Sequence, residues 1–130
     1  MLKCAVVILN YNGRKFLEQF LPNVLENTNR ELAEVIVADN ASTDDSVAFM
    51  QSHYPHIRLI ENESNGGFAT GYNLALRQIE AEYFVLLNSD IEVTPRWIEP
   101  VLEMMDADET IAACQPKILS YYDKTKFEYA

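Results

Sequence analysis

The segment Ala5-Val-Val-Ile-Leu-Asn-Tyr-Asn-Gly13 joins five apolar residues to a short polar stretch that ends in glycine. Its apolar half suits one buried strand, because it is short and rich in β-branched residues. Similar runs recur at Glu34–Ala38, Ile57–Ile60 and Tyr83–Leu87. Nearly continuous apolar strands are typical of a parallel sheet that is covered on both faces. This segment and the three similar apolar runs therefore predict an α/β fold.

Residues with helical spacing lie between the expected strands. This spacing predicts helices around Phe16–Leu25, Val47–Met50 and Leu74–Ile79. Strand and helix alternate, and each crossover between parallel strands is expected to be right-handed. The pattern predicts a single Rossmann-like domain over residues 1–130, with a mostly parallel sheet and helices on both faces.

The last part of the chain carries weaker patterns. A fourth helix is expected after Pro95, from Trp97 to Met105, because proline suits a first helical turn. Ile111–Cys114 and Ile118–Leu119 indicate further extended segments. Aromatic residues near the end are expected to form an exposed apolar edge that favours self-association. These residues are Tyr121, Tyr122, Phe127 and Tyr129.

Charge and composition exclude several classes of protein. The 20 Asp and Glu outnumber the 10 Lys and Arg, and a net charge of -10 repels nucleic acid and anionic lipid surfaces. An anionic nucleotide can still bind where backbone amides, a helix N-terminus or a metal ion supply positive potential. The first apolar run is too short for a signal peptide or a membrane span. We therefore expect a cytoplasmic protein.

Cysteine and histidine give no metal or disulfide pattern. Cys4 and Cys114 lie in apolar runs without paired spacing, so both are expected to be core residues. His53 and His56 stand close together, but no cysteine or further histidine joins them. Surface positions near a helix end are the better interpretation of both.

Polar clusters follow three of the expected strands. They are Asn10–Gly13, Asp39–Asp44 and Asn88–Asp90. Each one alone fits an ordinary turn or helix cap. In a parallel sheet, however, the carboxyl ends of the strands meet at one edge, where ligands bind. Together the clusters indicate a ligand site, with Asp39 and Asp90 on the same rim.

A glycine-rich segment, Asn65-Gly-Gly-Phe-Ala-Thr-Gly-Tyr-Asn73, enters the third helix. Its glycines let the backbone approach a ligand, and free amides at the helix start suit a phosphate or a ribose hydroxyl. The segment lacks the spacing of the dinucleotide-binding motif and of the P-loop.

Taken together, the four segments Val7–Gly13, Val37–Asp44, Asn65–Asn73 and Leu86–Asp90 resemble an inverting family 2 glycosyltransferase. The Asn-Tyr-Asn-Gly and Asn-Gly-Gly-Phe-Ala variants are similar to rhamnosyltransferase-type members. The resemblance implies a GT-A fold, a nucleotide diphosphate sugar donor, and a Mg²⁺ or Mn²⁺ ion that bridges the phosphates. It also implies a glycan or lipid-linked acceptor in cell-surface polysaccharide synthesis, peripheral to the inner membrane face.

The resemblance assigns roles to single residues. Asn10, Tyr11 and Asn12 would border the base and ribose, and Asp39 would accept a hydrogen bond from the ring imide of the base. Asn40 and Asp44 would brace that loop, whereas Asn73 would support the fold. The full set implied to bind the nucleotide sugar is Asn10, Tyr11, Asn12, Asp39, Asn40, Asn65, Gly66, Asn88 and Ser89.

Asp90 is the implied metal ligand, because the last acid of the family's Asp-x-Asp motif reaches the ion. Asn88 departs from the motif, since many members carry Asp there. An amide keeps an oxygen acceptor but removes one charge, which weakens metal or ribose contacts.

Sugar transfer with inversion needs a general base for the acceptor hydroxyl. The resemblance places this base in an acceptor-binding half beyond the matched region, so the 130-residue domain is expected to be truncated before it. Two alternatives follow. The chain belongs to an active transferase, or it is a noncatalytic nucleotide-sugar-binding module. A phosphoacceptor signalling domain is disfavoured, because the first strand ends in Asn10 and Tyr11 rather than in clustered acids.

Overall fold

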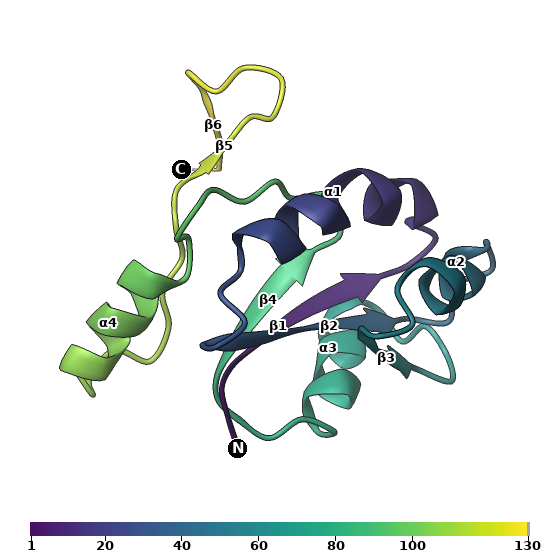
Figure 1. Ribbon diagram of the computed structural model, residues 1–130, viewed down its shortest axis with the longest axis horizontal. Helices are drawn as coiled ribbons and strands as arrows, with labels where there is room; N and C mark the ends of the chain where they lie inside the picture. Colours follow the sequence, from purple (N-terminus) through teal and green to yellow (C-terminus); the bar gives the residue numbers. More distant parts are fainter. Residues whose placement is uncertain (130) are drawn as a thin grey trace. The chain divides into compact units, whose positions relative to one another are not determined.

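The computed structural model describes residues 1–129, which form two compact units, Met1–Val93 and the part that starts at Thr94. In the first unit, strands and helices alternate (Figure 1). No helix among residues 1–129 is long and apolar enough to cross a membrane. In chain order, the first unit contains β1 (Leu2–Asn10), α1 (Arg14–Asn27), β2 (Ala33–Asp39), α2 (Ser46–His53), β3 (Arg58–Glu61), α3 (Phe68–Leu76) and β4 (Ala81–Asn88).

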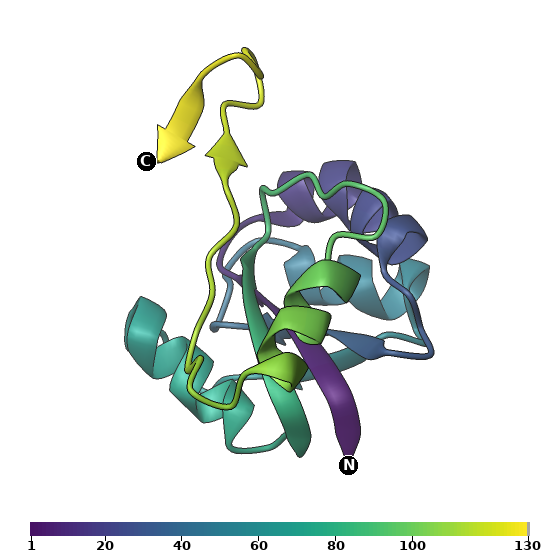
Figure 2. The ribbon, with the colours of Figure 1, turned by 90° about the vertical axis from the view of Figure 1, so that its left-hand side faces the viewer.

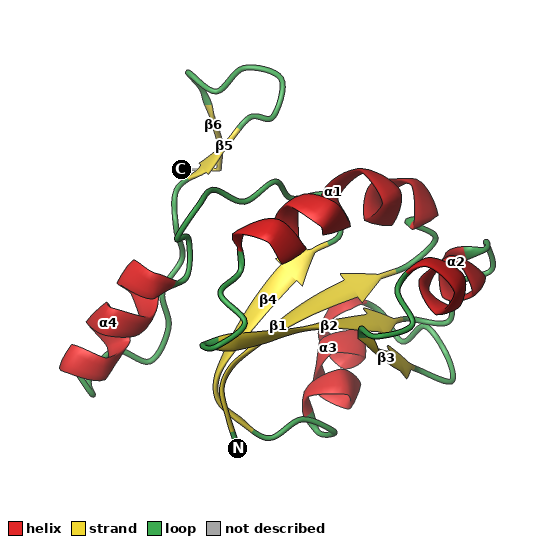
Figure 3. Cartoon of the chain, in the orientation of Figure 1, coloured by secondary structure: helices red, strands yellow, loops and turns green. Residues whose placement is uncertain are grey.

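These strands form one four-stranded sheet in the order β3-β2-β1-β4. All neighbouring pairs are parallel, and the register sets Asn10 beside Asp39 and Leu9 beside Asn88. The arrowheads in Figure 3 accordingly point to the same side of the sheet. The predicted α/β fold with a parallel sheet is confirmed, and the polar clusters after β1, β2 and β4 leave from one edge.

Helices cover both faces of this sheet, as the sequence predicts. β1 is central and is buried from Cys4 to Asn10. On one face, Val7 and Leu9 share a buried cluster with Tyr72 and Ala75 of α3. Figures 1 and 2 show α1 and α2 on the opposite face. The buried side of α1 consists of residues at the i, i+3, i+4 and i+7 spacing, namely Leu17, Phe20, Leu21 and Val24.

Tyr72 fastens α3 to the end of β4. Its hydroxyl donates to the backbone oxygen of Leu87 at 2.9 Å, and burial raises the pKa of the phenol to about 12. The expectation that Asn73 supports the fold is wrong, because that side chain is exposed. Successive helical residues point about 100° apart, so a helix that buries Tyr72 turns its neighbour outward. The helix also ends at Leu76, before Ile79, which lies buried beyond it.

The second unit contains α4 and one short antiparallel strand pair (Figure 2). Its elements are α4 (Glu99–Ala107), β5 (Ile118–Leu119) and β6 (Phe127–Tyr129). The fourth predicted helix is confirmed, but it begins at Glu99, with Pro100 rather than Pro95 in its first turn. The extended segment predicted at Ile111–Cys114 is not a strand, and most of it is exposed.

Only one of the two cysteines belongs to the core. Cys4 is fully buried in β1, and burial raises the pKa of its thiol to about 11. Cys114 is exposed, so the prediction of a core role is wrong for this residue. The apolar run that contains it joins no sheet and therefore gains no burial.

Iodoacetamide at about pH 8 is expected to modify Cys114 quickly and to spare Cys4 until the protein unfolds. The thiolate is the reactive form, and Cys4 is both inaccessible and protonated at that pH. Peptide mass mapping with and without urea measures the two rates. Equal modification of both cysteines in the native protein would contradict this placement.

Candidate functional site

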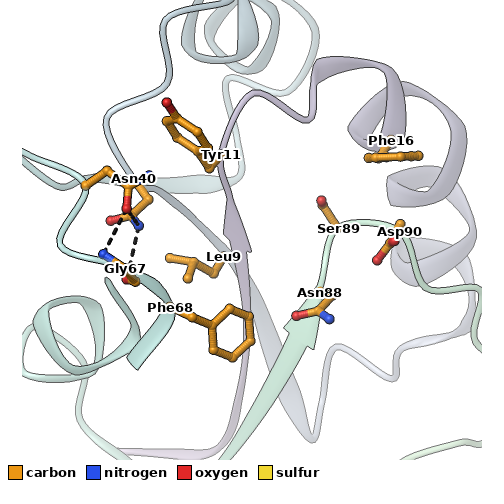
Figure 4. Close-up of a pocket in the computed structure, with 10 residues that line it drawn as sticks. Leu9, Tyr11, Phe16, Asn40, Gly67, Phe68, Asn88, Ser89 and Asp90 are labelled. Atoms are coloured by element: carbon orange, nitrogen blue, oxygen red, sulfur yellow. Dashed lines mark hydrogen bonds between the residues drawn. The ribbon is translucent and has the colours of Figure 1, made fainter. Parts of the chain in front are cut away.

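A pocket of about 380 Å³ opens at the edge where the parallel strands end. Figure 4 shows Asn40 and Gly67 on one side of it, and Asn88, Ser89 and Asp90 on the other. Its lining includes Tyr11, Asn40, Asn65, Asn88, Ser89 and Asp90 from the implied set. The other implied residues, Asn10, Asn12, Asp39 and Gly66, lie outside this lining.

Asp39 is a buried carboxylate whose first partners are protein groups. Its side chain is 3% exposed and ends β2. One oxygen accepts hydrogen bonds from Asn10 Nδ2 at 3.0 Å and from the Ser42 hydroxyl at 2.7 Å, and the other accepts from Ser42 N at 2.9 Å. Hydrogen bonds to a charged group stabilise by about 1.5–3 kcal/mol each. Asp39 thus fixes the β2–α2 loop against the end of β1.

Asn12 joins the β1–α1 loop to the β2–α2 loop. Its backbone adopts a φ of 51°, which asparagine tolerates better than most residues. Its side-chain oxygen accepts hydrogen bonds from Thr43 N at 2.7 Å and Asp44 N at 3.1 Å, while its own N–H donates to Ser42 Oγ at 2.9 Å. The polar atoms of Asn12 therefore brace the two loops.

Gly13 lets two polar segments approach each other. A Cβ at this position would overlap Asn10 Oδ1 and would lie 3.1 Å from Ser89 Oγ. The loop after β1 and the loop after β4 consequently meet across a residue without a side chain. The sequence identified Gly13 only as part of a turn, because the close approach depends on the register of β1 and β4.

Asn40 lies at the centre of a second network and lines the pocket. It is 2% exposed, and its Nδ2 donates to Asn65 Oδ1 at 3.0 Å. Its Oδ1 accepts a hydrogen bond from Asn62 Nδ2 at 3.0 Å. A Cβ on Gly71 would come within 2.9 Å of the Asn40 amide, so α3 packs tightly on this side chain. The network fastens the glycine-rich loop to the ends of β2 and β3.

Asn62 is the residue of this network that the sequence analysis missed. It is 8% exposed and follows β3 directly. Its Oδ1 has no hydrogen-bond partner within the described part of the chain. A signal was present in the sequence, because a polar stretch, Glu61-Asn62-Glu63, follows the third apolar run as the other clusters follow theirs.

Asp44 lies just before α2, accepts a hydrogen bond from the first residue of that helix, and carries a pKa shift near the site. Desolvation alone would raise the pKa of this carboxyl, but hydrogen bonds from Ser46 and from the N–H of Arg14 hold it below its ordinary value. The Ser46 N–H lies 2.9 Å and the Arg14 N–H 3.2 Å from the carboxylate oxygens. Asp44 thus joins the start of α1 to the start of α2, which agrees with its expected bracing role.

The contribution of Asp44 to stability is expected to vanish in acid. A carboxyl whose pKa falls on folding stabilises the protein above its unfolded pKa of about 4 and loses that effect as pH falls through the folded value. Urea unfolding of the wild type and of Asp44→Asn measures the difference. We expect a difference below about 1 kcal/mol near neutral pH, because the group is exposed, and none near pH 2. An equal difference at both pH values would contradict this assignment.

Oxygen donors of the β4 loop fit a hard divalent cation. Asn88, Ser89 and Asp90 offer an amide oxygen, a hydroxyl and a carboxylate, which are ligands that Mg²⁺ and Mn²⁺ accept. No group of three or more His, Cys, Asp or Glu that could hold a metal occurs among the described residues. Mg²⁺ commonly uses one or two carboxylates and completes its shell with water and substrate phosphates. The donor set therefore fits an ion that is held jointly with a diphosphate.

Comparison with known proteins gives one family. Residues 5–130 match the profile described as Glycosyl transferase family 2. The chondroitin synthase of Escherichia coli is 31% identical over 111 residues, which cover 83% of this chain and 16% of that protein.

Solved structures share the fold. The mannosyltransferase PcManGT from Pyrobaculum calidifontis, in complex with GDP-Man and Mn²⁺, matches with a TM-score of 0.64 and 27% identity over 74% of this chain and 32% of its own. TarS 1-349 of S. aureus, in complex with UDP-GlcNAc, matches with a TM-score of 0.71 and 23% identity over 83% and 32%. These matches confirm the implied GT-A fold. The chain spans about a third or less of the length of these proteins.

Proposed function

Because the chain belongs to glycosyl transferase family 2, we propose that its pocket holds a nucleotide diphosphate sugar for transfer of the sugar to an acceptor hydroxyl. The observation that carries this proposal is the pocket at the carboxyl edge of the sheet, with Asn40 and Asn65 on one side and the Asn88–Asp90 loop on the other. Ligands of open parallel sheets bind at this edge. The complexes of PcManGT with GDP-Man and of TarS with UDP-GlcNAc support a donor of this class.

The base and ribose lie, in this proposal, along the ends of β1 and β2. The Tyr11 ring is 50% exposed and lines the pocket, so it offers a face for a base or a ribose. Asp39 Oδ2 accepts one protein hydrogen bond, from Ser42 N, and a carboxylate oxygen has room for a second donor, such as the imide N–H of a base. Asn10 and Asn12 hold the loops that present these groups, and Gly66 lies near the nucleotide, beside Asn65.

A divalent cation is proposed at Asp90, with Asn88 and Ser89 beside it. The PcManGT complex with Mn²⁺ supports the choice of ion. When bound, Mg²⁺ or Mn²⁺ would neutralise charge on the departing nucleotide diphosphate. The chain's own residues orient the donor, because the two asparagine networks hold the loops after β1, β2 and β3 in place.

The acceptor and stereochemistry are further parts of the proposal. Transfer proceeds with inversion to a glycan or lipid-linked hydroxyl in cell-surface polysaccharide synthesis, on the inner face of the membrane. Similarity to a chondroitin synthase supports a glycan product. The motif variants Asn10–Gly13 and Asn65–Ala69 support a rhamnosyl-type donor. The general base belongs to an acceptor-binding half that these 130 residues do not include. The exposed aromatic residues Tyr121, Tyr122 and Phe127 provide a self-associating edge, whereas the Tyr129 side chain lies outside the described residues.

A second candidate is donor binding without transfer. This chain spans about a third or less of each of these similar proteins, which favours binding without transfer for the 130 residues taken alone. Isothermal titration with UDP-, GDP- and dTDP-sugars and Mn²⁺ tests binding, and a transfer assay with released nucleoside diphosphate as readout tests chemistry. Binding with product supports the transferase, and binding without product supports the second candidate. No binding of any donor would refute both.

A further inference from the structure

The three asparagines of the Asn40 network form a directed series of hydrogen bonds. Asn62 Nδ2 donates to Asn40 Oδ1 at 3.0 Å and to Gly71 O at 3.2 Å. Asn40 Nδ2 donates in turn to Asn65 Oδ1 at 3.0 Å and to Gly67 O at 3.3 Å. The N–H of Gly67 also donates to Asn65 Oδ1, at 2.9 Å. The series runs from the buried end of β3 to the pocket.

Backbone groups and the neighbouring amides together set the direction of each amide. The carbonyl oxygens of Gly71 and Gly67 only accept, so a side-chain nitrogen has to face each of them. The Gly67 N–H only donates, so Asn65 has to turn its oxygen toward it. The Asn62 amide keeps its orientation although its buried Oδ1 has no partner within the described residues. If it were reversed, its oxygen would face two acceptors, Asn40 Oδ1 and Gly71 O. The three orientations are therefore coupled.

The oxygen of Asn65 is occupied by two donors, which leaves its NH₂ group for other partners. Asn65 is exposed and lines the pocket, and within residues 1–129 no hydrogen bond from its Nδ2 is found. We infer that Asn65 presents an N–H donor to an oxygen acceptor of the bound nucleotide, and that Asn62 is a positioning residue that sets this polarity. This inference rests on the proposed donor-binding function.

The substitution Asn65→Asp tests the polarity directly. Aspartate keeps an oxygen for Asn40 and Gly67 but replaces the NH₂ with a second oxygen. We expect an unchanged midpoint of urea unfolding and a rise of about tenfold to a hundredfold in the Kd for a nucleoside diphosphate. Ser64→Asp adds the same charge at the neighbouring position without altering the donor, and its Kd should rise by less than about threefold. Unchanged or tighter binding by Asn65→Asp would overturn the inference.

The ligand's acceptor oxygen belongs either to a phosphate or to the nucleoside. Titration of the wild type and of Asn65→Asp with uridine, UMP and UDP separates the two possibilities. If uridine nucleotides do not bind, the corresponding guanosine and thymidine compounds replace them. A loss of affinity confined to the phosphorylated ligands assigns a phosphate oxygen, and a loss shared by the nucleoside assigns a base or ribose oxygen. No loss with any of them overturns the inference.

Asn62→Asp tests the positioning role. Its carboxylate cannot donate to Asn40 Oδ1 and sets an oxygen against it. We therefore expect the Asn40 and Asn65 amides to reverse, at the cost of their hydrogen bonds with Gly67. In ¹⁵N NMR spectra of the ligand-free protein, the Asn65 NH₂ signal should exchange quickly with water in the wild type and slowly in Asn62→Asp. The Kd should rise by a similar factor in Asn62→Asp, in Asn65→Asp and in the double variant, because coupled changes do not multiply.

Asn29→Asp is the matched control for Asn62→Asp. Among the residues that the structure describes, the Asn29 side chain takes part in a hydrogen bond only through its oxygen, which accepts from Glu31 N at 3.0 Å. Asn29→Asp should therefore leave the exchange rate of the Asn65 NH₂ signal and the Kd for the nucleotide unchanged. An Asn65 signal that is unaffected by Asn62→Asp would overturn the positioning role. If Asn62→Asp does not fold, the wild-type exchange rates of the three NH₂ groups decide the orientation instead. Failure of the wild type to bind any nucleotide would refute the proposed function, whereas the ligand-free spectra would still decide the amide directions.

Discussion

Replacing Asp39 with asparagine is expected to destabilise the protein by about 3 kcal/mol or more and to abolish nucleotide binding. The new NH₂ group would face N–H and O–H donors that now share a carboxylate, in a position that is 3% exposed. A buried donor without a partner costs about 1–3 kcal/mol, and hydrogen bonds to charged groups lie at the upper end. Urea unfolding measures the stability, and calorimetry measures binding to the folded fraction.

Asp45→Asn is the control for this change. It removes the same charge from the same loop, but Asp45 is exposed and lies 3.9 Å from the Arg14 guanidinium, a pair worth less than about 1 kcal/mol. If Asp39→Asn unfolds at the same urea concentration as Asp45→Asn, the carboxylate does not organise the loops as described.

Asp90→Asn is expected to lower metal-dependent affinity for a nucleotide diphosphate by at least tenfold while leaving stability unchanged. Asp90 is the only acid in the lining of the pocket, and its side chain is exposed. Removing a residue that only hydrogen-bonds to a metal ligand commonly lowers metal affinity tenfold to a hundredfold. Removing the ligand itself should lower the metal affinity at least as much. Calorimetric titrations with and without Mn²⁺ measure the metal-dependent part.

Glu63→Gln controls for the loss of one negative charge, because Glu63 is an exposed acid of the β3–α3 loop outside the pocket lining. An equal effect of both substitutions would mean that the pocket responds to net charge. Asp90 would then have no special role.

Local patterns were enough to predict most of the fold. The apolar run Ala5–Leu9 and its three counterparts predicted the parallel sheet, because strands buried on both faces leave a nearly continuous apolar signature. β1 and β2 are buried in this way, whereas Phe84 and Leu86 of β4 are exposed. The short apolar run Ile111–Cys114 led to a wrong prediction of an extended segment, because it carries the same apolar signature. An apolar run of four residues does not by itself say whether a partner strand exists, and this one has none.

The candidate site was less predictable than the sheet. Polar clusters after strands located its edge, but the roles inside it depend on contacts between distant segments. Asn12 was expected to border the ligand, and the structure adds that its side-chain oxygen braces a loop. Asn62 went unnoticed and holds Asn40. Asparagine occupies caps, turns and ligand sites alike, so only the partners of its amide separate these roles.

A nucleotide diphosphate and a divalent cation are proposed to meet at the loop after β4. Paramagnetic broadening by Mn²⁺ in ¹H–¹⁵N spectra of the chain, recorded with a bound nucleotide diphosphate, tests this proposal most directly. We expect the amide signals of Asn88, Ser89 and Asp90 to vanish first, followed by those of Tyr11 and Asn65. Broadening that centres on the exposed acids Asp106, Asp108 and Glu109 instead, with the pocket signals intact, would contradict it.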